Sequence, residues 1–262
     1  MKIDLTGKRA MVCGSTAGIG KAVAIQLAEA GASVTLVARN EDKLKAVTAE
    51  LSTLSGQTHG YLVADFSKPE ALKIVVENHM VSANPYHILL NNTGGPPGGK
   101  ATDASLDEFE RAFRSHLMCN HVMAQALVEG MKAENYGRII NIISTSVKIP
   151  LNGLGVSNTI RGAVANWSKT LANELGEFGI TVNNVLPGAT ETERLSSIIS
   201  NKASKTGKSE AEVSDAMRAQ VPAGRFAQPW EVAAAATFLA SPMASYINGI
   251  NVPVDGGRTG SL

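Results

Sequence analysis

Three glycines near the N-terminus have a spacing that suits the binding of a phosphate group. Gly14, Gly18 and Gly20 separate a short apolar run, Arg9–Cys13, from a helical pattern. Glycine lets a pyrophosphate approach the backbone closely, and the next helix offers free N–H groups at the positive end of its dipole. A P-loop is disfavoured, because the lysine after the last glycine is followed by alanine rather than Ser or Thr. We therefore predict a dinucleotide-binding turn, with a plain tight turn as the alternative.

The end of the second apolar run indicates which dinucleotide would bind. Ser33–Ala38 is followed by Arg39 and Asn40, with no acidic residue before them. An acidic side chain at this point bonds the ribose 2′-hydroxyl of NAD(H), whereas an arginine accommodates a 2′-phosphate. The sequence thus favours NADP(H) over NAD(H). The alternative is that Arg39 is a surface residue at the start of a helix.

Short apolar runs alternate with helical patterns along the whole chain. The strand-like runs are Arg9–Cys13, Ser33–Ala38, Gly60–Ala64, His87–Leu90, Arg138–Ile143, Ile180–Leu186 and Ile250–Val254. Helical periodicity covers Lys21–Ala30, Asn40–Leu54, Leu106–Lys132 and Arg161–Phe178. Continuously apolar strands between helices are typical of a parallel sheet that is covered on both sides. We predict an α/β fold: one Rossmann-type doubly wound parallel sheet of about seven strands, with helices on both faces.

Composition excludes several other classes of protein. Of 262 residues, 24 are Lys or Arg and 23 are Asp or Glu, so the net charge of +1 predicts no nucleic-acid partner and no polybasic membrane contact. Two cysteines are too few for a disulfide scaffold. We expect no metal site, because the histidines lack metal-binding spacing: His59, His79, His87, His116 and His121. No apolar run is long enough to span a membrane, and residues 1–8 lack a signal-peptide pattern, so a cytoplasmic protein is expected.

One domain is predicted over residues 1–262, because no linker or repeat divides the chain. Its most polar stretch, Glu191–Gln220, is predicted to be an excursion over the substrate site; a solvated pair of surface helices is an equal alternative. A second glycine run, Gly94–Gly99, follows the fourth strand. Ligands bind at the carboxyl ends of parallel strands, so we expect this run to form a pocket wall rather than a plain connector.

Several motifs together resemble the short-chain dehydrogenase/reductase family along essentially the whole chain, and the overall pattern is similar to its 3-oxoacyl-acyl-carrier-protein reductases. They are the glycine spacing itself, Asp65 after the third strand, Asn91-Asn92-Thr93-Gly94, Pro187-Gly188, Thr192 and Val254-Asp255-Gly256-Gly257. The resemblance implies that the cofactor contacts Gly14, Ser15, Thr16, Gly18, Ile19, Gly20, Arg39, Asn40, Asp65, Phe66, Asn92, Thr93, Gly94, Arg161, Pro187, Gly188 and Thr192.

The catalytic positions of the family are occupied differently in this chain. The family uses an Asn, a Ser, a Tyr and a Lys, of which only the serine is present, as Ser144. Ser157 occupies the tyrosine position, Arg161 the lysine position and His116 the asparagine position. A serine hydroxyl is a poor acid, and arginine stays protonated. Arg161 can still hold a ribose and polarise an oxygen as a fixed cation.

His116 is the residue at the predicted site whose ordinary pKa lies near neutral pH. We hypothesise that it replaces the missing proton donor, directly or through water and Ser157. The alternative is a histidine buried between helices with its hydrogen bonds satisfied.

These observations favour an NADP(H)-dependent oxidoreductase that transfers hydride between nicotinamide and a small carbonyl or alcohol substrate, with an atypical proton-transfer group. The loss of Tyr and Lys leaves two alternatives open: a cofactor-binding protein without turnover, such as a sensor or an inactive oligomer partner, and a non-redox enzyme on the same scaffold.

The resemblance also implies a homo-oligomer, usually a tetramer. Its contacts would involve the helices near Leu106–Lys132 and Ser157–Phe178, and the C-terminal segment with Val252-Pro253-Val254 and Leu262.

Overall fold

The computed structural model describes residues 3–261, so Leu262 lies outside the described residues. Seven parallel strands form one sheet in the order β3-β2-β1-β4-β5-β6-β7. Their bounds are β1 Arg9–Cys13, β2 Ser33–Ala38, β3 Gly60–Val63, β4 Ile88–Asn91, β5 Gly137–Ile142, β6 Ile180–Pro187 and β7 Asn251–Val254. The predicted fold class is confirmed, and every predicted strand lies within one residue of its observed bounds.

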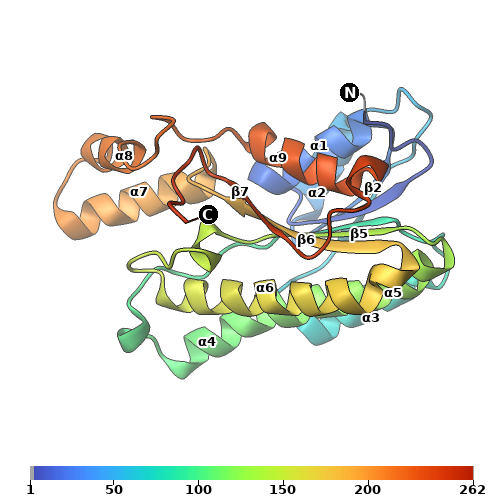
Figure 1. Ribbon diagram of the computed structural model, residues 1–262, viewed down its shortest axis with the longest axis horizontal. Helices are drawn as coiled ribbons and strands as arrows, with labels where there is room; N and C mark the ends of the chain where they lie inside the picture. The colour runs from blue at the N-terminus through green and yellow to red at the C-terminus, as the bar shows by residue number, and fades with distance from the viewer. Residues whose placement is uncertain (1–2, 262) are drawn as a thin grey trace.

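Helices cover both faces of the sheet (Figure 1). On one face lie α1 (Gly18–Glu29), α2 (Glu41–Glu50) and α9 (Pro229–Ala240), whose apolar side chains share a core with Val12, Leu36 and other strand residues. On the other face lie α3 (Pro69–Met80), α4 (Leu106–Phe113), α5 (Cys119–Ala133) and α6 (Gly155–Leu175), and a second core includes Met11, Leu89 and Val182. Because both faces are covered, the five inner strands are almost wholly buried, which is why they are continuously apolar in sequence, whereas the edge strands β3 and β7 are partly exposed. No helix within residues 3–261 is long and apolar enough to cross a membrane.

A row of four asparagines crosses one half of the sheet. Asn91, Asn141, Asn184 and Asn251 are register partners on β4, β5, β6 and β7. Each of the first three donates its side-chain Nδ2–H to the Oδ1 of the next, at 2.9, 3.0 and 2.8 Å. A one-residue slip of any strand would break this row and bury unpaired amides, so the row fixes the register just below the edge that carries the site.

The helix predicted over Leu106–Lys132 is interrupted. A turn of π-helix, Arg114–Met118 (η2), separates α4 from α5 and contains His116. The other predicted helices are displaced: α1 begins before Lys21, α2 ends at Glu50 rather than Leu54, and α6 begins six residues before Arg161. The helices α3 and α9 were not predicted from the sequence. Short 3-10 turns are Ala101–Asp103, Thr145–Val147, Gly176–Phe178 and Pro242–Ala244.

The polar stretch Glu191–Gln220 folds as two helices, α7 (Glu193–Thr206) and α8 (Glu210–Arg218). They project from the end of the molecule where β6 ends (Figure 1). Leu195, Ala203 and Val213 are buried, while most of the remaining side chains of this segment are exposed. Its exposure agrees with the predicted alternative of a solvated pair of surface helices. Its position beside the end of β6 is compatible with the other prediction, an excursion over the substrate site.

Candidate active site

The carboxyl ends of β1, β4, β5 and β6 meet at one edge of the sheet, and the segments that follow these strands gather there. The glycine turn follows β1, residues 92–99 follow β4, Ser144 follows β5 and Pro187–Thr192 joins β6 to α7. In an open parallel sheet, ligands bind at such an edge, where neighbouring strands connect to opposite faces. That point lies between β1 and β4, because the chain order reverses there.

Two of the three glycines are required by the packing of the turn itself. A Cβ on Gly14 would overlap the backbone of Asn92, and one on Gly20 would overlap the carbonyl of Gly14. Asn92 closes this arrangement, because its Nδ2 donates to the carbonyl oxygen of Gly14 at 3.1 Å. Gly14 and Gly18 also have positive φ, +59° and +55°, which disfavours any residue with a side chain. The sequence predicted room for a ligand, with a plain tight turn as the alternative; in the structure, close backbone packing by itself requires Gly14 and Gly20.

The turn fits a bound dinucleotide. The hydroxyl of Ser15 is buried and has no hydrogen-bond partner within residues 3–261, which suits a donor aimed at a phosphate. Ala17, the residue before α1, gives the helix no side-chain cap, and the first turn carries no acidic residue, so its N–H groups face no competing carboxylate. Thr16 is half-buried beside them, and Ile19 packs on the core below.

Four candidate residues lie at the ends of β2 and β3, where the adenosine half would bind. The pKa of the Asp65 carboxyl is lowered mainly by the backbone N–H of Ser67, and the charge of the exposed Arg39 lowers it further. Asn40 is already used, since its Oδ1 accepts from the N–H of Lys43 at 2.8 Å and caps α2. Phe66 packs against the second core, so its side chain anchors this loop.

At the opposite end of the turn, the remaining candidates surround the position expected for nicotinamide. Thr192 caps α7, accepting from the N–H of Leu195, and its Cγ2 lies 3.1 Å from the point where a Cβ on Gly18 would stand. Pro187 precedes Gly188, where a Cβ would lie 2.8 Å from the Cα of Asp255. The glycine therefore allows the end of β6 to pack closely against Asp255. Gly94 is exposed with open space around it.

His116 does not titrate near neutral pH, and that expectation was wrong. Its side chain is only 2% exposed, and burial, with the charge of Arg161, lowers its pKa to about 3. Its Nδ1 lies 2.5 Å from the hydroxyl of Thr93, in a hydrogen bond that ties the π-turn to the segment after β4. The residue matches the alternative interpretation, a buried histidine whose hydrogen bond is satisfied. A neutral imidazole at pH 7 carries no extra proton to give to a substrate.

Ser144, Ser157 and Arg161 come from two elements. Ser144 follows β5, and its Oγ accepts from the N–H of Ser146 at 3.1 Å, which leaves its own hydrogen free to donate. Ser157 and Arg161 lie four residues apart on α6, on one side of the helix. Arg161 is 8% exposed and donates Nη1–H to the carbonyl oxygen of Ile142 at 3.0 Å. Burial, with the charge of Arg194, lowers its pKa to about 10, so it remains a cation at neutral pH.

Sequence reasoning missed Arg194 at this site. It lies in the first turn of α7 and donates Nη2–H to the carbonyl oxygen of Pro96 at 2.7 Å. The signal in the sequence was its position two residues after Thr192, within the polar stretch Glu191–Gln220.

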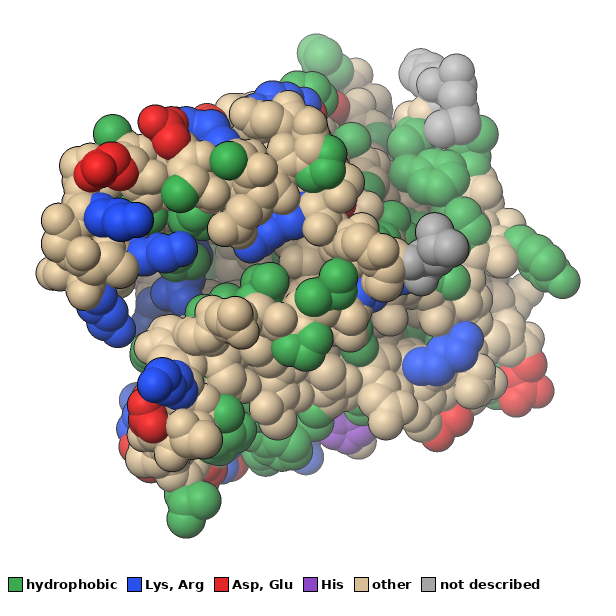
Figure 2. Space-filling view, turned by 60° about the vertical axis from the view of Figure 1, so that its left-hand side comes forward, with side chains coloured by type: hydrophobic (Ala, Val, Ile, Leu, Met, Phe, Trp, Pro, Cys, Tyr) green, Lys and Arg blue, Asp and Glu red, His purple; other side chains and the backbone are tan. Residues whose placement is uncertain are grey.

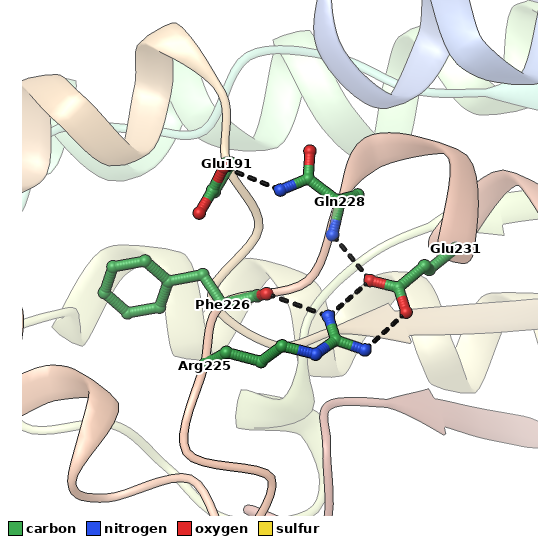
Figure 3. A network of polar contacts seen from close by, with 5 residues as sticks. All are labelled: Glu191, Arg225, Phe226, Gln228 and Glu231. Atoms are coloured by element: carbon green, nitrogen blue, oxygen red, sulfur yellow. Dashed lines mark hydrogen bonds and ion pairs between the residues drawn. The ribbon is translucent and has the colours of Figure 1, made fainter.

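A polar network braces the segment that leads into α7 (Figure 3). Arg225 donates two hydrogen bonds of 2.7 Å to the carboxylate of Glu231, and these lower the pKa of Glu231 to about 2. Gln228 donates its backbone N–H to Glu231 and its side-chain Nε2–H to Glu191. Backbone bonds of Ala227 with residues 189 and 191 complete the connection. The network therefore joins the start of α9 to the residues just before Thr192.

Among residues 3–261, no group of three or more His, Cys, Asp or Glu side chains is placed to hold a metal ion.

Sheet order, glycine turn and loop cluster together define a Rossmann-type α/β protein with its site at the carboxyl edge of the sheet. A family model described as enoyl-(acyl carrier protein) reductase matches residues 14–259. The chain belongs to the short-chain dehydrogenase/reductase family, as the motifs predicted.

Named relatives are similar over nearly their full lengths. The 7alpha-hydroxysteroid dehydrogenase of Escherichia coli (strain K12) is 31% identical, over 99% of this chain and 97% of that protein. The 3-oxoacyl-[acyl-carrier-protein] reductase of Aquifex aeolicus is 32% identical, over 98% and 99%. A crystal structure of L-sorbose reductase from Gluconobacter frateurii, complexed with NADPH and L-sorbose, is 31% identical over 100% of both chains, with a TM-score of 0.93.

Proposed function

We propose that this protein is an NADP(H)-dependent oxidoreductase that transfers hydride between nicotinamide and a carbonyl or alcohol substrate without the tyrosine acid of its family. The observation that carries this proposal is the dinucleotide-type turn, with the buried unpartnered hydroxyl of Ser15, at the same sheet edge as Ser144 and Arg161. The relatives named above, which are dehydrogenases and reductases, support it.

A preference for NADP(H) rests on Arg39. Its side chain is exposed after β2, and the residue before it is alanine, so no carboxylate occupies the usual place for binding a ribose 2′-hydroxyl. The solved structure of L-sorbose reductase contains NADPH, and a reductase called YwfH, 27% identical with a TM-score of 0.91, is described as NADPH dependent.

Three side chains act on the substrate oxygen in this proposal. When bound, NADPH supplies the hydride. Ser144 and Ser157 donate hydrogen bonds to the substrate oxygen, and Ser144 is held for this by the N–H of Ser146. Arg161 supplies fixed positive charge that stabilises the alkoxide oxygen as negative charge develops on it. Because the pKa of His116 is about 3 and that of Arg161 about 10, neither donates a proton near pH 7, and the alkoxide takes its proton from water.

A protein that binds NADP(H) without turnover is the second candidate. It is favoured by the neutral state of His116, which leaves the site without the positioned acid that contributes typically 10²–10⁴-fold in rate. A non-redox enzyme on the same scaffold gains no specific support from the geometry.

Fluorescence titration with NADPH and NADH tests the cofactor first, and a screen of NADPH oxidation with ketones, aldehydes and oxo acids tests turnover. We expect tighter binding of NADPH than of NADH, and Arg39→Asp should reverse that order. Lys45→Gln is the matched control, because it removes a positive charge from α2 that Glu41 already pairs at 3.0 Å. Tight NADPH binding with no oxidation on any substrate would favour the second candidate.

A homo-oligomer and a cytoplasmic location remain part of the proposal. Leu106 and Phe113 on α4 have exposed apolar side chains, as an interface on that helix would require. Light scattering in solution tests the state directly, with a tetramer as the expected result.

A further inference from the structure

Two arginines from different helices converge on one point of the site. The Nη2 atoms of Arg161 and Arg194 lie 3.8 and 3.5 Å from the position that a Cβ on Gly95 would occupy. Arg161 comes from α6 and Arg194 from the start of α7, on either side of the segment that follows β4. Because Gly95 has no side chain, no protein atom occupies the position of its Cβ, beside the two guanidinium groups.

Neither charge is neutralised by the protein. Within residues 3–261, neither Arg161 nor Arg194 has an acidic partner within ion-pair distance. Their hydrogen bonds in this region go to the carbonyl oxygens of Ile142 and Pro96. A cation as buried as Arg161 is costly unless it is paired, and a second cation beside it adds repulsion. Two adjacent arginines without acidic partners therefore suit the binding of an anion.

The surface around this point is consistent with such a ligand. Figure 2 shows a hollow on the side of the molecule where α7 and α8 project, with Lys and Arg side chains gathered around it. Burial and Arg194 lower the pKa of Arg161, but only to about 10, so its guanidinium group stays charged at neutral pH.

We infer that the substrate is an oxo acid or its hydroxy-acid product, and that Arg161 and Arg194 bind its carboxylate beside Gly95. This inference rests on the proposed function. The phosphates of the cofactor are accounted for elsewhere, by the turn with Ser15 and by Arg39. Arg161 also bonds Ile142, two residues before Ser144, which places the carboxylate next to the proposed position of the reacting oxygen. Guanidinium groups suit this role, because their planar forks match a carboxylate.

The experiment compares acids with their neutral methyl esters. NADPH oxidation is measured with short-chain 2-oxo and 3-oxo acids and with the corresponding esters, and calorimetry follows binding of the same acids to NADPH-loaded protein. We expect wild type to prefer acid over ester by about tenfold or more in kcat/KM, since charge-assisted hydrogen bonds are the strong ones. Arg194→Gln should lower that ratio about tenfold, and Arg194→Lys should retain most of it.

Two controls separate a contact from a general effect. Lys205→Gln removes a positive charge from the far end of α7, roughly 16 Å along the helix axis, and should leave the acid-to-ester ratio unchanged. The NADPH dissociation constant of Arg194→Gln should stay within about twofold of wild type. Arg194 is exposed, so this variant is expected to fold.

The inference is overturned if wild type treats acids and esters alike, if Lys205→Gln lowers the ratio as much as Arg194→Gln, or if Arg194→Gln weakens NADPH binding and leaves the ratio unchanged. If no substrate oxidises NADPH, the proposed function fails. The binding of acids measured by calorimetry then tests the anion site without any turnover. Acid binding that is lost in Arg194→Gln supports the anion site, and no acid binding to NADPH-loaded wild type overturns it.

Discussion

His116 and Arg161 are neighbours whose pKa values lie on opposite sides of neutral pH. Burial lowers the pKa of His116 to about 3 and that of Arg161 to about 10. Between those limits one is neutral and the other charged, and neither changes state. We therefore predict that kcat for ketone reduction is nearly constant from about pH 5 to pH 9, measured as NADPH oxidation at saturating substrate. If His116 with an ordinary pKa of 6.5 donated the proton, kcat would fall about tenfold per pH unit above 6.5; such a fall would contradict this account.

The buried side chain of His116 also makes the free energy of unfolding depend on pH. Below pH 6.5 an unfolded chain protonates His116, whereas the folded protein keeps it neutral until about pH 3. Since the unfolded state binds the additional proton, this residue destabilises the fold as the pH falls from about 6.5 to 3, by roughly 1.4 kcal/mol per pH unit. Urea unfolding between pH 7 and pH 4 should show a smaller loss of stability in His116→Asn than in wild type. His79 and His87 also have lowered pKa values and contribute to the slope that remains. Equal slopes in the two proteins would show that His116 is solvated.

The sequence alone located the glycine turn, but it could not show which of its glycines are required for packing and which for the approach of a ligand. Gly14 and Gly20 are required because a Cβ at either position would overlap Asn92 or the turn itself. These contacts exist only in the folded chain and cannot be read from the sequence. His116 was predicted to titrate because its ordinary pKa was the information available, and the burial that changes it arises from packing of the π-turn. Arg194 was missed for a similar reason, since its proximity to Arg161 depends on how α7 is placed over Gly95.

Among the elements, the π-turn Arg114–Met118 has the most direct effect on the site. It allows α4 and α5 to follow one another while His116 points to Thr93. Short π-helical turns inside longer helices are frequent at functional sites. Helical periodicity alone predicts one continuous helix here, because a single extra residue in a turn hardly changes the spacing of apolar positions. For strands the prediction was better, because their apolar runs are short and are bounded by polar turns.

The bracing network at the start of α9 predicts a second effect at the scale of elements. Arg225→Gln removes both bonds to Glu231 and so loosens residues 225–228, which hold residues 189–191 by backbone hydrogen bonds. Because Thr192 follows directly, NADPH binding should weaken several-fold in a fluorescence titration. Arg111→Gln is the control, since it breaks an exposed ion pair with Asp107 on α4. An unchanged NADPH dissociation constant in Arg225→Gln would show that the 189–192 segment is positioned without this network.

For the molecule as a whole, alternating strands and helices predicted the α/β class and the parallel sheet. The strand order and the row of asparagines across β4–β7 were not predicted, because neighbours in the sheet are distant in the chain. The sheet brings the turn after β1 and the segments after β4, β5 and β6 to one edge, and this arrangement permits residues from four parts of the chain to act on one ligand.

Hydride transfer by a protein without the family's tyrosine is the central claim, and isotope transfer tests it most directly. The protein is incubated with NADPH carrying deuterium at both C4 positions and with the panel of ketones and oxo acids, and the alcohols formed are analysed by mass spectrometry. This account predicts an alcohol product that has gained one deuterium on the former carbonyl carbon. Tight NADPH binding with no deuterated product from any substrate would contradict it.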